Sequence, residues 1–309
     1  MLTERDLKLN LNKLVGLGFD GCSTMAGKEN GVQQLIRNEY PNATFFRCSS
    51  HKLNLVINDL NSVQVVQNSI GVIEETIMFF RESPKRHAMV SNLPLLCETR
   101  WSAKYKSIRL FYEKFIFITT VLQNMSTDVM FSAKTKSKAQ QLLCSVSSSQ
   151  FIMCLNIIAK YSSLLEPVAN KLQGVSIDLL SVKYHVDTLI TMFEKDRTNA
   201  NSVFSNIFKK CTEIANELNI DIKTPQTIPC QNYRSNIQGK SPEEYFRISI
   251  FIPYLDSIIS SLKTRFSSNN TSAFSLSRFR PALIKERINL SESQLDDNSK
   301  KFGVENLKA

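Results

Sequence analysis

The sequence predicts a mainly helical protein with a small α/β part near its amino-terminal end. Glycine and proline are scarce, at 9 each in 309 residues, so few residues break helices. From about residue 62 to residue 266, apolar residues recur at helical spacing. Before residue 62, short apolar runs alternate with short amphipathic segments, as in strand–helix–strand–helix units.

The first sixty residues contain two expected strands and two expected helices. Residues 13–19, KLVGLGF, predict a buried strand closed by glycine-rich turn chemistry, and residues 43–49, ATFFRCS, predict a second strand. Helices are expected over 29–40, ending before Pro41, and over 51–60. Connections this short predict a parallel strand pair with a right-handed crossover. Two strands are too few for a stable open sheet, so either other segments complete it or the chain is a fragment.

Helical periodicity then predicts helices over 63–82, 100–124, 137–159, 160–173, 176–195, 201–218 and 242–266. Ser241 begins the last of these with a capping box, Ser-Pro-Glu-Glu, in which proline takes the first helical position. Residues 219–240 contain two prolines and many polar residues, which predicts an exposed loop. Residues 267–309 lose the periodicity, and we expect a mobile polar tail there with one short helix at 281–287.

These patterns predict three parts: an α/β part over 1–61, a helical domain over 62–266 and the polar tail over 267–309. No stretch reaches the length of about eighteen uncharged apolar residues that a membrane span needs, so we expect no membrane partner. The charged start, MLTERDLKLNLNK, is not a secretory signal. The 7 scattered cysteines predict reduced thiols in the nucleus or cytoplasm.

The net charge of +10 is concentrated in two blocks. Residues 61–140 carry 11 basic and 6 acidic residues, and residues 230–290 carry 9 basic and 4 acidic residues. Such a concentration favours a polyanion such as DNA as partner. Solvated basic helix faces are the alternative, because neither block shows the aromatic and arginine spacing of a nucleic-acid reader.

Asp20 is the first candidate for chemistry. It follows the first expected strand in the turn LGFDGCSTM. Open α/β folds place ligand and metal sites at the carboxyl ends of their parallel strands. A structural role is the alternative, because aspartate commonly accepts backbone N–H bonds within its own turn.

Cys48 and His51, at the end of the second expected strand, are spaced as half of a zinc site. The nearest further ligands are His87 and Cys97, and their spacing matches no standard zinc module. Alternatively, His51 caps the following helix or contacts phosphate, or the two residues form a buried hydrogen-bonded pair.

Two later stretches carry cationic side chains at expected helix starts. Lys85, Arg86 and His87 lie in SPKRH, and Arg100 and Trp101 lie in CETRW with Thr99 as the expected N-cap. A sole tryptophan is more often a core anchor than a platform for base stacking.

The order of these stretches resembles the hAT superfamily of transposases. The matching stretches are GLGFDGCSTMAGKENGVQ, FFRCSSHKLNLVI, FFRESPKRH, LLCETRWSAKYKSI and SPEEYFRISIFIPYLDSIISSLKTRF. The resemblance covers most of residues 14–266. It is closest to the host-gene branch of zinc-finger MYM-type proteins and of the repressor of the inhibitor of the protein kinase.

The resemblance implies a partial ribonuclease H-like fold with a large helical insertion that begins near residue 62. Active relatives hold two Mg²⁺ or Mn²⁺ ions with three acidic residues for strand cleavage and transfer. Asp20 matches the second of these acids. Cys48 and His51 match a C-x-x-H motif near the DNA end, and Trp101 matches a tryptophan that stacks on an extruded base. We also count Lys85, Arg86 and Arg100 among the expected DNA contacts.

The departures from the family pattern predict an inactive remnant, truncated at both ends. The family's first acid would lie upstream of residue 14, and Glu4 and Asp6 do not lie on a strand. The third acid would lie where this chain becomes polar, and no amino-terminal zinc finger precedes the domain. We therefore expect no bound cofactor, no catalysis, and binding of DNA, of a protein or of a second copy. The alternatives are an incomplete sequence of an active metal-dependent transposase and a helical protein-interaction module.

Overall fold

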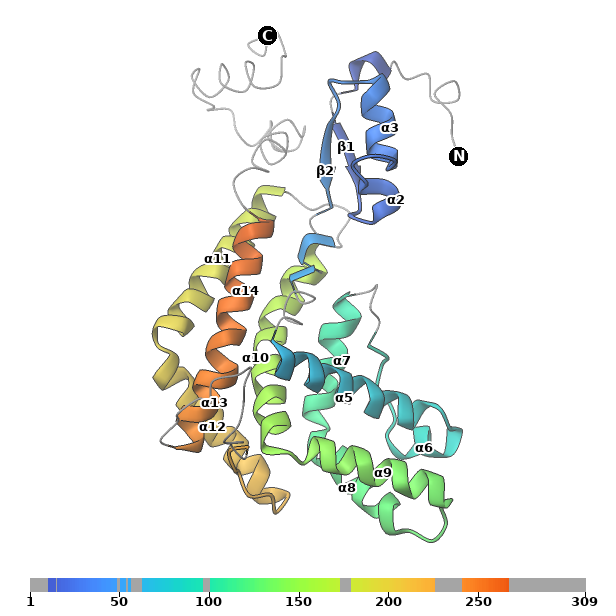
Figure 1. Ribbon diagram of the computed structural model, residues 1–309, viewed down its shortest axis with the longest axis vertical. Helices are drawn as coiled ribbons and strands as arrows, with labels where there is room; N and C mark the ends of the chain where they lie inside the picture. The colour runs from blue at the N-terminus through green and yellow to red at the C-terminus, as the bar shows by residue number, and fades with distance from the viewer. Residues whose placement is uncertain are drawn as a thin grey trace, which may run out of the picture. The chain divides into compact units, whose positions relative to one another are not determined.

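The computed structural model describes residues 11–14, 16–48, 51–53, 55–56, 63–96, 101–172, 179–225 and 241–266. The chain divides into two compact units, which are described separately (Figure 1). The first unit comprises Met1–Leu55, Lys171–Asp187 and Lys263–Ala309, and the second comprises Val56–Asn170 and Thr188–Leu262. The expected polar tail and its short helix lie outside the described residues.

The first unit contains the predicted strand pair. Its elements are η1 (Leu11–Lys13), β1 (Gly16–Phe19), α2 (Ser23–Ala26), α3 (Val32–Glu39) and β2 (Thr44–Arg47). The two strands are parallel, with Gly16 opposite Thr44 and Phe19 opposite Arg47, which confirms the predicted pairing. Residues 51–53 and 55–56 are helical, as expected for the segment after β2. The short helix α2 was not predicted.

Two glycines hold the connection between β1 and α3 in a close approach. A Cβ atom on Gly31 would lie 2.4 Å from the Gly27 nitrogen, so larger residues do not fit between these backbones. The buried Gln33 side chain fixes the same turn by donating from Nε2 to the Gly27 carbonyl at 2.9 Å. The connection between α2 and α3 is therefore locally constrained.

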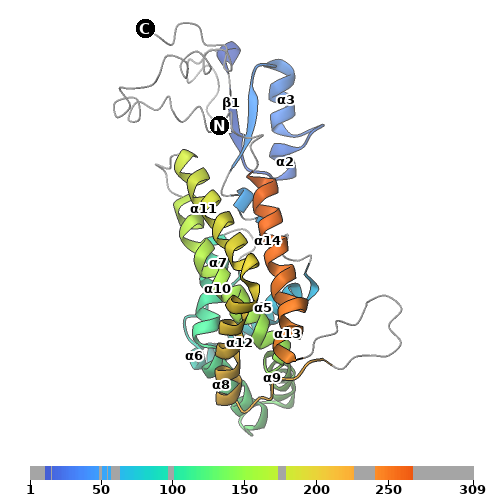
Figure 2. The same cartoon turned by 90° about the vertical axis from the view of Figure 1, so that its left-hand side faces the viewer.

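The second unit is helical, and α10 runs through its centre, with α11 and α14 alongside in both views (Figures 1 and 2). Its helices are α5 (Gln64–Arg81), α6 (Pro84–Met89), α7 (Trp101–Glu113), α8 (Phe115–Thr127), α9 (Ala133–Val146), α10 (Ser149–Leu172), α11 (Leu179–Thr198), α12 (Ala200–Glu217), α13 (Pro242–Phe246) and α14 (Ile252–Arg265), some of whose ends belong to the first unit. A π-helical segment, Arg247–Phe251, joins α13 to α14. The mainly helical class with a small parallel sheet is thus confirmed.

Two predicted helix boundaries were wrong. The expected helix over 100–124 is interrupted at Lys114, whose φ of −101° and ψ of 8° separate α7 from α8. The expected boundary near residue 160 lies inside α10, and the break falls instead between Val146 and Ser149. There, the Ser148 hydroxyl accepts the Phe151 N–H at 3.2 Å, as an N-cap does. The cap at Ser241 was predicted correctly, since its hydroxyl accepts the Glu244 N–H at 3.2 Å.

The core of the second unit is rich in aromatic residues that surround α10. Tyr161 packs edge-on against Phe193 with ring centroids 5.1 Å apart, and it also contacts Phe251 and Tyr254. A second group joins Phe111, Phe115 and Phe151. Offset and edge-on aromatic pairs add to the stabilisation from buried area.

Helix α10 has the length and composition of a membrane span, but 72% of its apolar window is buried within the protein. Its apolar side chains are therefore covered by neighbouring helices, as in the core helix of a globular protein. The described part of the chain thus gives only weak grounds for a membrane span.

Candidate functional site

The parallel strand pair brings the ends of β1 and β2 to one edge. Asp20 directly follows Phe19, and Cys48 directly follows Arg47, which pairs with Phe19. The Cys48 N–H continues the ladder by donating to the Phe19 carbonyl at 2.8 Å. Two of the residues that the sequence singles out therefore emerge side by side at the carboxyl edge of the sheet.

The Asp20 carboxylate is bound within its own turn. Its Oδ1 accepts the backbone N–H of Cys22 at 3.2 Å, which is an Asx turn. Hydrogen bonding from Cys22 lowers the pKa of Asp20, and the nearby His51 lowers it further. The carboxylate is fully exposed to solvent. The surroundings of Asp20 therefore stabilise its charged form in a structural role within the turn.

His51 packs against the glycine that follows Asp20. A Cβ atom on Gly21 would lie 2.6 Å from Cδ2 of the His51 ring, so only glycine leaves room for this ring position. Asp20, Gly21 and His51 therefore form one local arrangement. Gly21 could have been identified from the sequence, because it directly follows the candidate acid.

The edge also carries cationic residues next to the exposed Cys48. Lys52 is half-buried. Its pKa is lowered chiefly by desolvation and, to a smaller extent, by repulsion from Arg47. The Lys52 N–H donates to the Cys48 carbonyl at 3.0 Å. Because Cys48 is exposed, the alternative of a buried Cys48–His51 pair is wrong.

Metal binding requires several donor side chains that converge. Among the described residues, no group of three or more His, Cys, Asp or Glu side chains could hold a metal ion. Asp20 is held by a backbone donor and faces His51, and two-metal chemistry needs several carboxylates around the ions. The residues that the structure describes around Asp20 therefore do not fit a Mg²⁺ or Mn²⁺ pair. For zinc, Cys97 lies outside the described residues.

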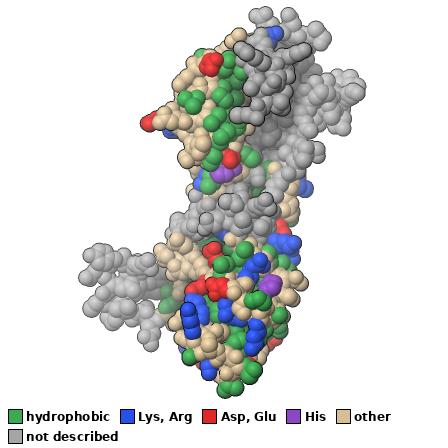
Figure 3. All heavy atoms as spheres, turned by 90° about the vertical axis from the view of Figure 1, so that its right-hand side faces the viewer, with side chains coloured by type: hydrophobic (Ala, Val, Ile, Leu, Met, Phe, Trp, Pro, Cys, Tyr) green, Lys and Arg blue, Asp and Glu red, His purple; other side chains and the backbone are tan. Residues whose placement is uncertain are grey.

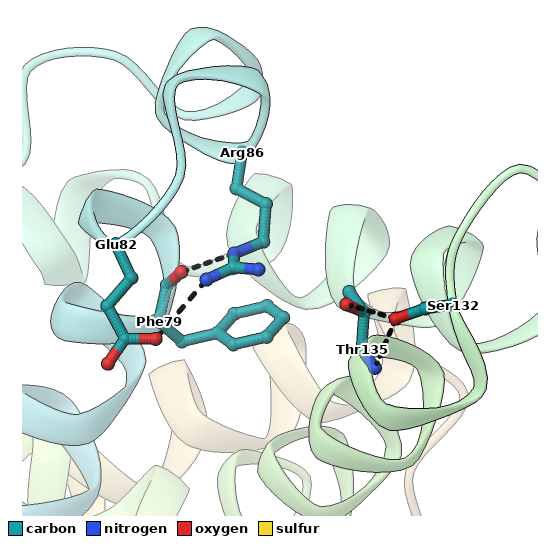
Figure 4. A network of polar contacts seen from close by, with 5 residues as sticks. All are labelled: Phe79, Glu82, Arg86, Ser132 and Thr135. Atoms are coloured by element: carbon teal, nitrogen blue, oxygen red, sulfur yellow. Dashed lines mark hydrogen bonds and ion pairs between the residues drawn. The ribbon is translucent and has the colours of Figure 1, made fainter.

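Arg86, one of the expected DNA contacts, is held against α5 in the second unit (Figure 4). Its Nε donates to the Phe79 carbonyl at 2.6 Å, and its Nη2 lies 3.2 Å from Glu82. The guanidinium also lies 4.5 Å from the centre of the Phe79 ring. Its side chain is only 15% exposed, so Arg86 fastens α6 to the end of α5.

Lys85 lies on the same short helix but is exposed. Its Nζ lies 4.6 Å from the centre of the Phe131 ring. Phe131 belongs to the connection between α8 and α9. Arg100 lies outside the described residues. Trp101 begins α7, and its side chain also lies outside the described part.

Several cations of the first basic block are used for structure. Arg81 donates to the Leu93 carbonyl at 3.0 Å, and Lys114 donates to the Ser91 carbonyl at 2.6 Å. Arg109 pairs with two glutamates, and Lys138 pairs with Glu75. The sequence alone does not reveal these roles, because a lysine or arginine that binds another part of the protein cannot be told in the sequence from one whose charge is free in solvent.

Lysine and arginine side chains gather on the face of the helical unit shown in Figure 3, with some acidic side chains between them. Lys85 and Lys134 are exposed, and neither forms an ion pair with another described residue. The described part of the second basic block, residues 241–266, contains three basic and three acidic residues, so this part carries no excess charge.

Known proteins resemble this chain over nearly its full length. It is 22% identical over 316 residues to the human 52 kDa repressor of the inhibitor of the protein kinase, covering 96% of this chain. It is 21% identical over 309 residues to the mouse protein of the same name, covering 94% of this chain. The chain spans 41% of the length of each. No protein-family profile matches the chain, and no solved structure matches it.

Proposed function

We propose that this chain is a transposase-derived domain of the hAT type that binds DNA in the nucleus without cleaving it. The observation that carries the proposal is the similarity to the repressor proteins over 96% of the chain, in the branch that the motifs indicate. The net charge of +10 supports a polyanionic partner. A ribonuclease H-like core completed by other segments belongs to the same proposal.

The DNA-binding surface that we propose lies on α6 and the start of α9. Lys85 and Lys134 are exposed, and Lys136 is half-exposed. Lys85 is placed by its contact with Phe131, which directly precedes the α9 cap Ser132. Helix α9 has no acidic residue in its first turn, so its amino-terminal end adds no opposing charge. Phosphate groups are the natural partners of such a surface.

Duplex affinity of matched lysine variants tests this surface. Replacing Lys85 and Lys134 together by Gln removes two phosphate contacts, and the salt slope of binding should fall by about 1 for each lysine that contacts phosphate. Lys209→Gln on α12 is the control, because Lys209 is an exposed lysine outside the proposed surface. If the double variant and the control lose the same DNA affinity, the proposed surface is wrong.

Arg86→Gln separates a structural cation from a DNA contact. Because Arg86 holds the end of α5, this change should lower the melting temperature, whereas Lys85→Gln should leave it unchanged. After correction for unfolded protein, Arg86→Gln should retain DNA affinity. A loss of DNA affinity without a loss of thermal stability would make Arg86 a DNA contact, as the sequence predicts.

The absence of cleavage is the second half of the proposal. It is supported by the Asx turn in which Asp20 takes part, and by the lack of a group of metal-binding side chains around Asp20 among the described residues. The measurement is duplex cleavage with Mg²⁺ or Mn²⁺ added, and we expect none above the level of an Asp20→Ala variant. Metal-dependent turnover that disappears in Asp20→Ala would establish an active transposase instead.

A helical protein-interaction module is the second candidate. It is favoured by Val129 and Met130 in the connection between α8 and α9, which are 86% and 74% exposed. Exposed apolar side chains beside cations suit a protein partner as well as a phosphate backbone. This candidate predicts no salt-sensitive affinity for DNA.

A further inference from the structure

A hollow of about 350 Å³ lies in the second unit between α7, α10 and α12. Its wall includes Ala159 and Ile207, and its polar residues include Tyr112 and Asn156. Binding pockets for small molecules have volumes of about 300–1,000 Å³ and combine apolar walls with a few placed polar groups. This hollow lies at the small end of that range.

Tyr112 and Asn156 form a fixed polar pair in the hollow. The Tyr112 hydroxyl donates to Oδ1 of Asn156 at 3.0 Å, and Nδ2 of Asn156 donates to the Ile152 carbonyl at 2.9 Å. Asn156 is only 5% exposed. Both side chains are therefore held in one orientation, and the Tyr112 oxygen keeps acceptor capacity.

One lysine of the lining is available to an anionic ligand. The lining contains three cations, Arg109, Lys160 and Lys210, and the carboxylate of Glu113. Arg109 pairs with Glu113 and Glu166, and Lys160 pairs with Asp196. Lys210 is exposed and forms no ion pair among the described residues. Lys210 is therefore the cation of the lining that a bound anion can pair with.

We propose that this hollow binds a small organic anion, such as an aromatic carboxylate. Its charged group would lie against Lys210, and its apolar body would lie against Ala159 and Ile207. A neutral molecule of the same shape would lose the charge-assisted contact, which is the stronger kind of hydrogen bond. This site is independent of the DNA-binding proposal, which concerns α6 and α9.

The test is a ¹⁹F NMR titration of the full chain with 4-fluorobenzoate. The uncharged 4-fluorobenzamide serves as the matched ligand control. We expect saturable binding of the benzoate, and affinity for the amide lower by about tenfold, which corresponds to the loss of one charge-assisted contact. Equal affinities, or no saturable binding of the benzoate, would overturn the proposal.

Three variants locate the binding. Lys210→Gln should weaken benzoate binding by about tenfold. Lys209→Gln changes the adjacent exposed lysine, which does not line the hollow, and should leave binding unchanged. Ser163→Phe places a large ring at an exposed residue of the lining and should abolish binding while the protein stays folded. Equal effects of the two lysine variants, or unchanged binding in a folded Ser163→Phe protein, would contradict the assignment.

Discussion

The strand edge of the first unit and the helical body of the second unit use their polar side chains differently. At the strand edge, Asp20 is fully exposed and holds one backbone N–H of its own turn. In the helical body, Arg86 is mostly buried. It donates to the Phe79 carbonyl, pairs with the Glu82 carboxylate and packs against the Phe79 ring. Both residues belong to the motifs of the resemblance. Motif membership therefore does not distinguish a side chain open to a ligand from one that fastens helices together.

Thiol reactivity gives the largest expected contrast. Burial raises the pKa of both Cys154 and Cys211 to about 12, and their Sγ atoms contact backbone carbonyls. Among the described residues, Cys22, Cys48 and Cys144 are exposed. Because the thiolate is the nucleophile, a thiol reagent at pH 8 should label these three exposed cysteines and leave Cys154 and Cys211 unlabelled. Peptide mapping by mass spectrometry reads the result, and labelling of Cys154 in native protein would contradict the buried core.

The raised thiol pKa values also set a pH dependence. The unfolded thiols ionise near 9.0, whereas the folded thiols stay protonated up to about 12. The folded state therefore binds more protons in this window, and its stability is full below pH 9 and falls as the pH rises toward 12. Cys154→Ala should reduce this alkaline loss, which urea unfolding at several pH values measures.

Truncation of a central aromatic residue should have the next largest effect. Phe251 is completely buried and contacts the rings of Tyr161 and Phe204. Phe251→Ala should lower the free energy of unfolding by about 4 kcal/mol, because it removes apolar contact and leaves a cavity. Phe117→Ala is the control, since Phe117 is 53% exposed. Similar losses in the two variants would place Phe251 outside the core.

Removal of one partly buried hydrogen bond should have a smaller effect. The Tyr161 hydroxyl donates to Oδ2 of Asp196 at 2.7 Å, and Lys160 contacts the same oxygen at 3.0 Å. Tyr161→Phe keeps the ring and should lower the free energy of unfolding by about 1–2 kcal/mol, because the acceptor is charged. An unchanged midpoint in urea would mean that Asp196 gains nothing from this hydroxyl.

The smallest effect is expected at the strand edge. The pKa of Asp20 is lowered in the folded protein from its usual 3.8, chiefly by the Cys22 hydrogen bond. Its contribution to stability is therefore present above pH 3.8 and is lost as the pH falls through the lower folded value. Asp20→Asn should give a slight loss at pH 7 that disappears in strong acid. A large loss at pH 7 would mean that the carboxylate has partners beyond its turn.

The sequence predicts the strand edge well because short-range patterns determine it. Apolar runs closed by glycine predict β1 and β2, and the short crossover predicts their parallel pairing, which places Asp20 beside Cys48. The breaks at Lys114 and at Ser147 were missed because apolar residues continue at helical spacing through both. The role of Arg86 was missed because its partner carbonyl at Phe79 becomes available only when α5 ends nearby. Such contacts depend on tertiary structure.

The salt dependence of duplex DNA affinity tests the central claim most directly. We propose that cations of the helical unit bind phosphate, and each phosphate neutralised should contribute about −0.9 to the slope of log affinity against log salt concentration. The account predicts binding that weakens steeply between about 50 and 200 mM salt, with a shallower slope when Lys85 and Lys134 are both replaced by Gln. Affinity that does not change with salt, or no binding at the lower salt concentration, would contradict it.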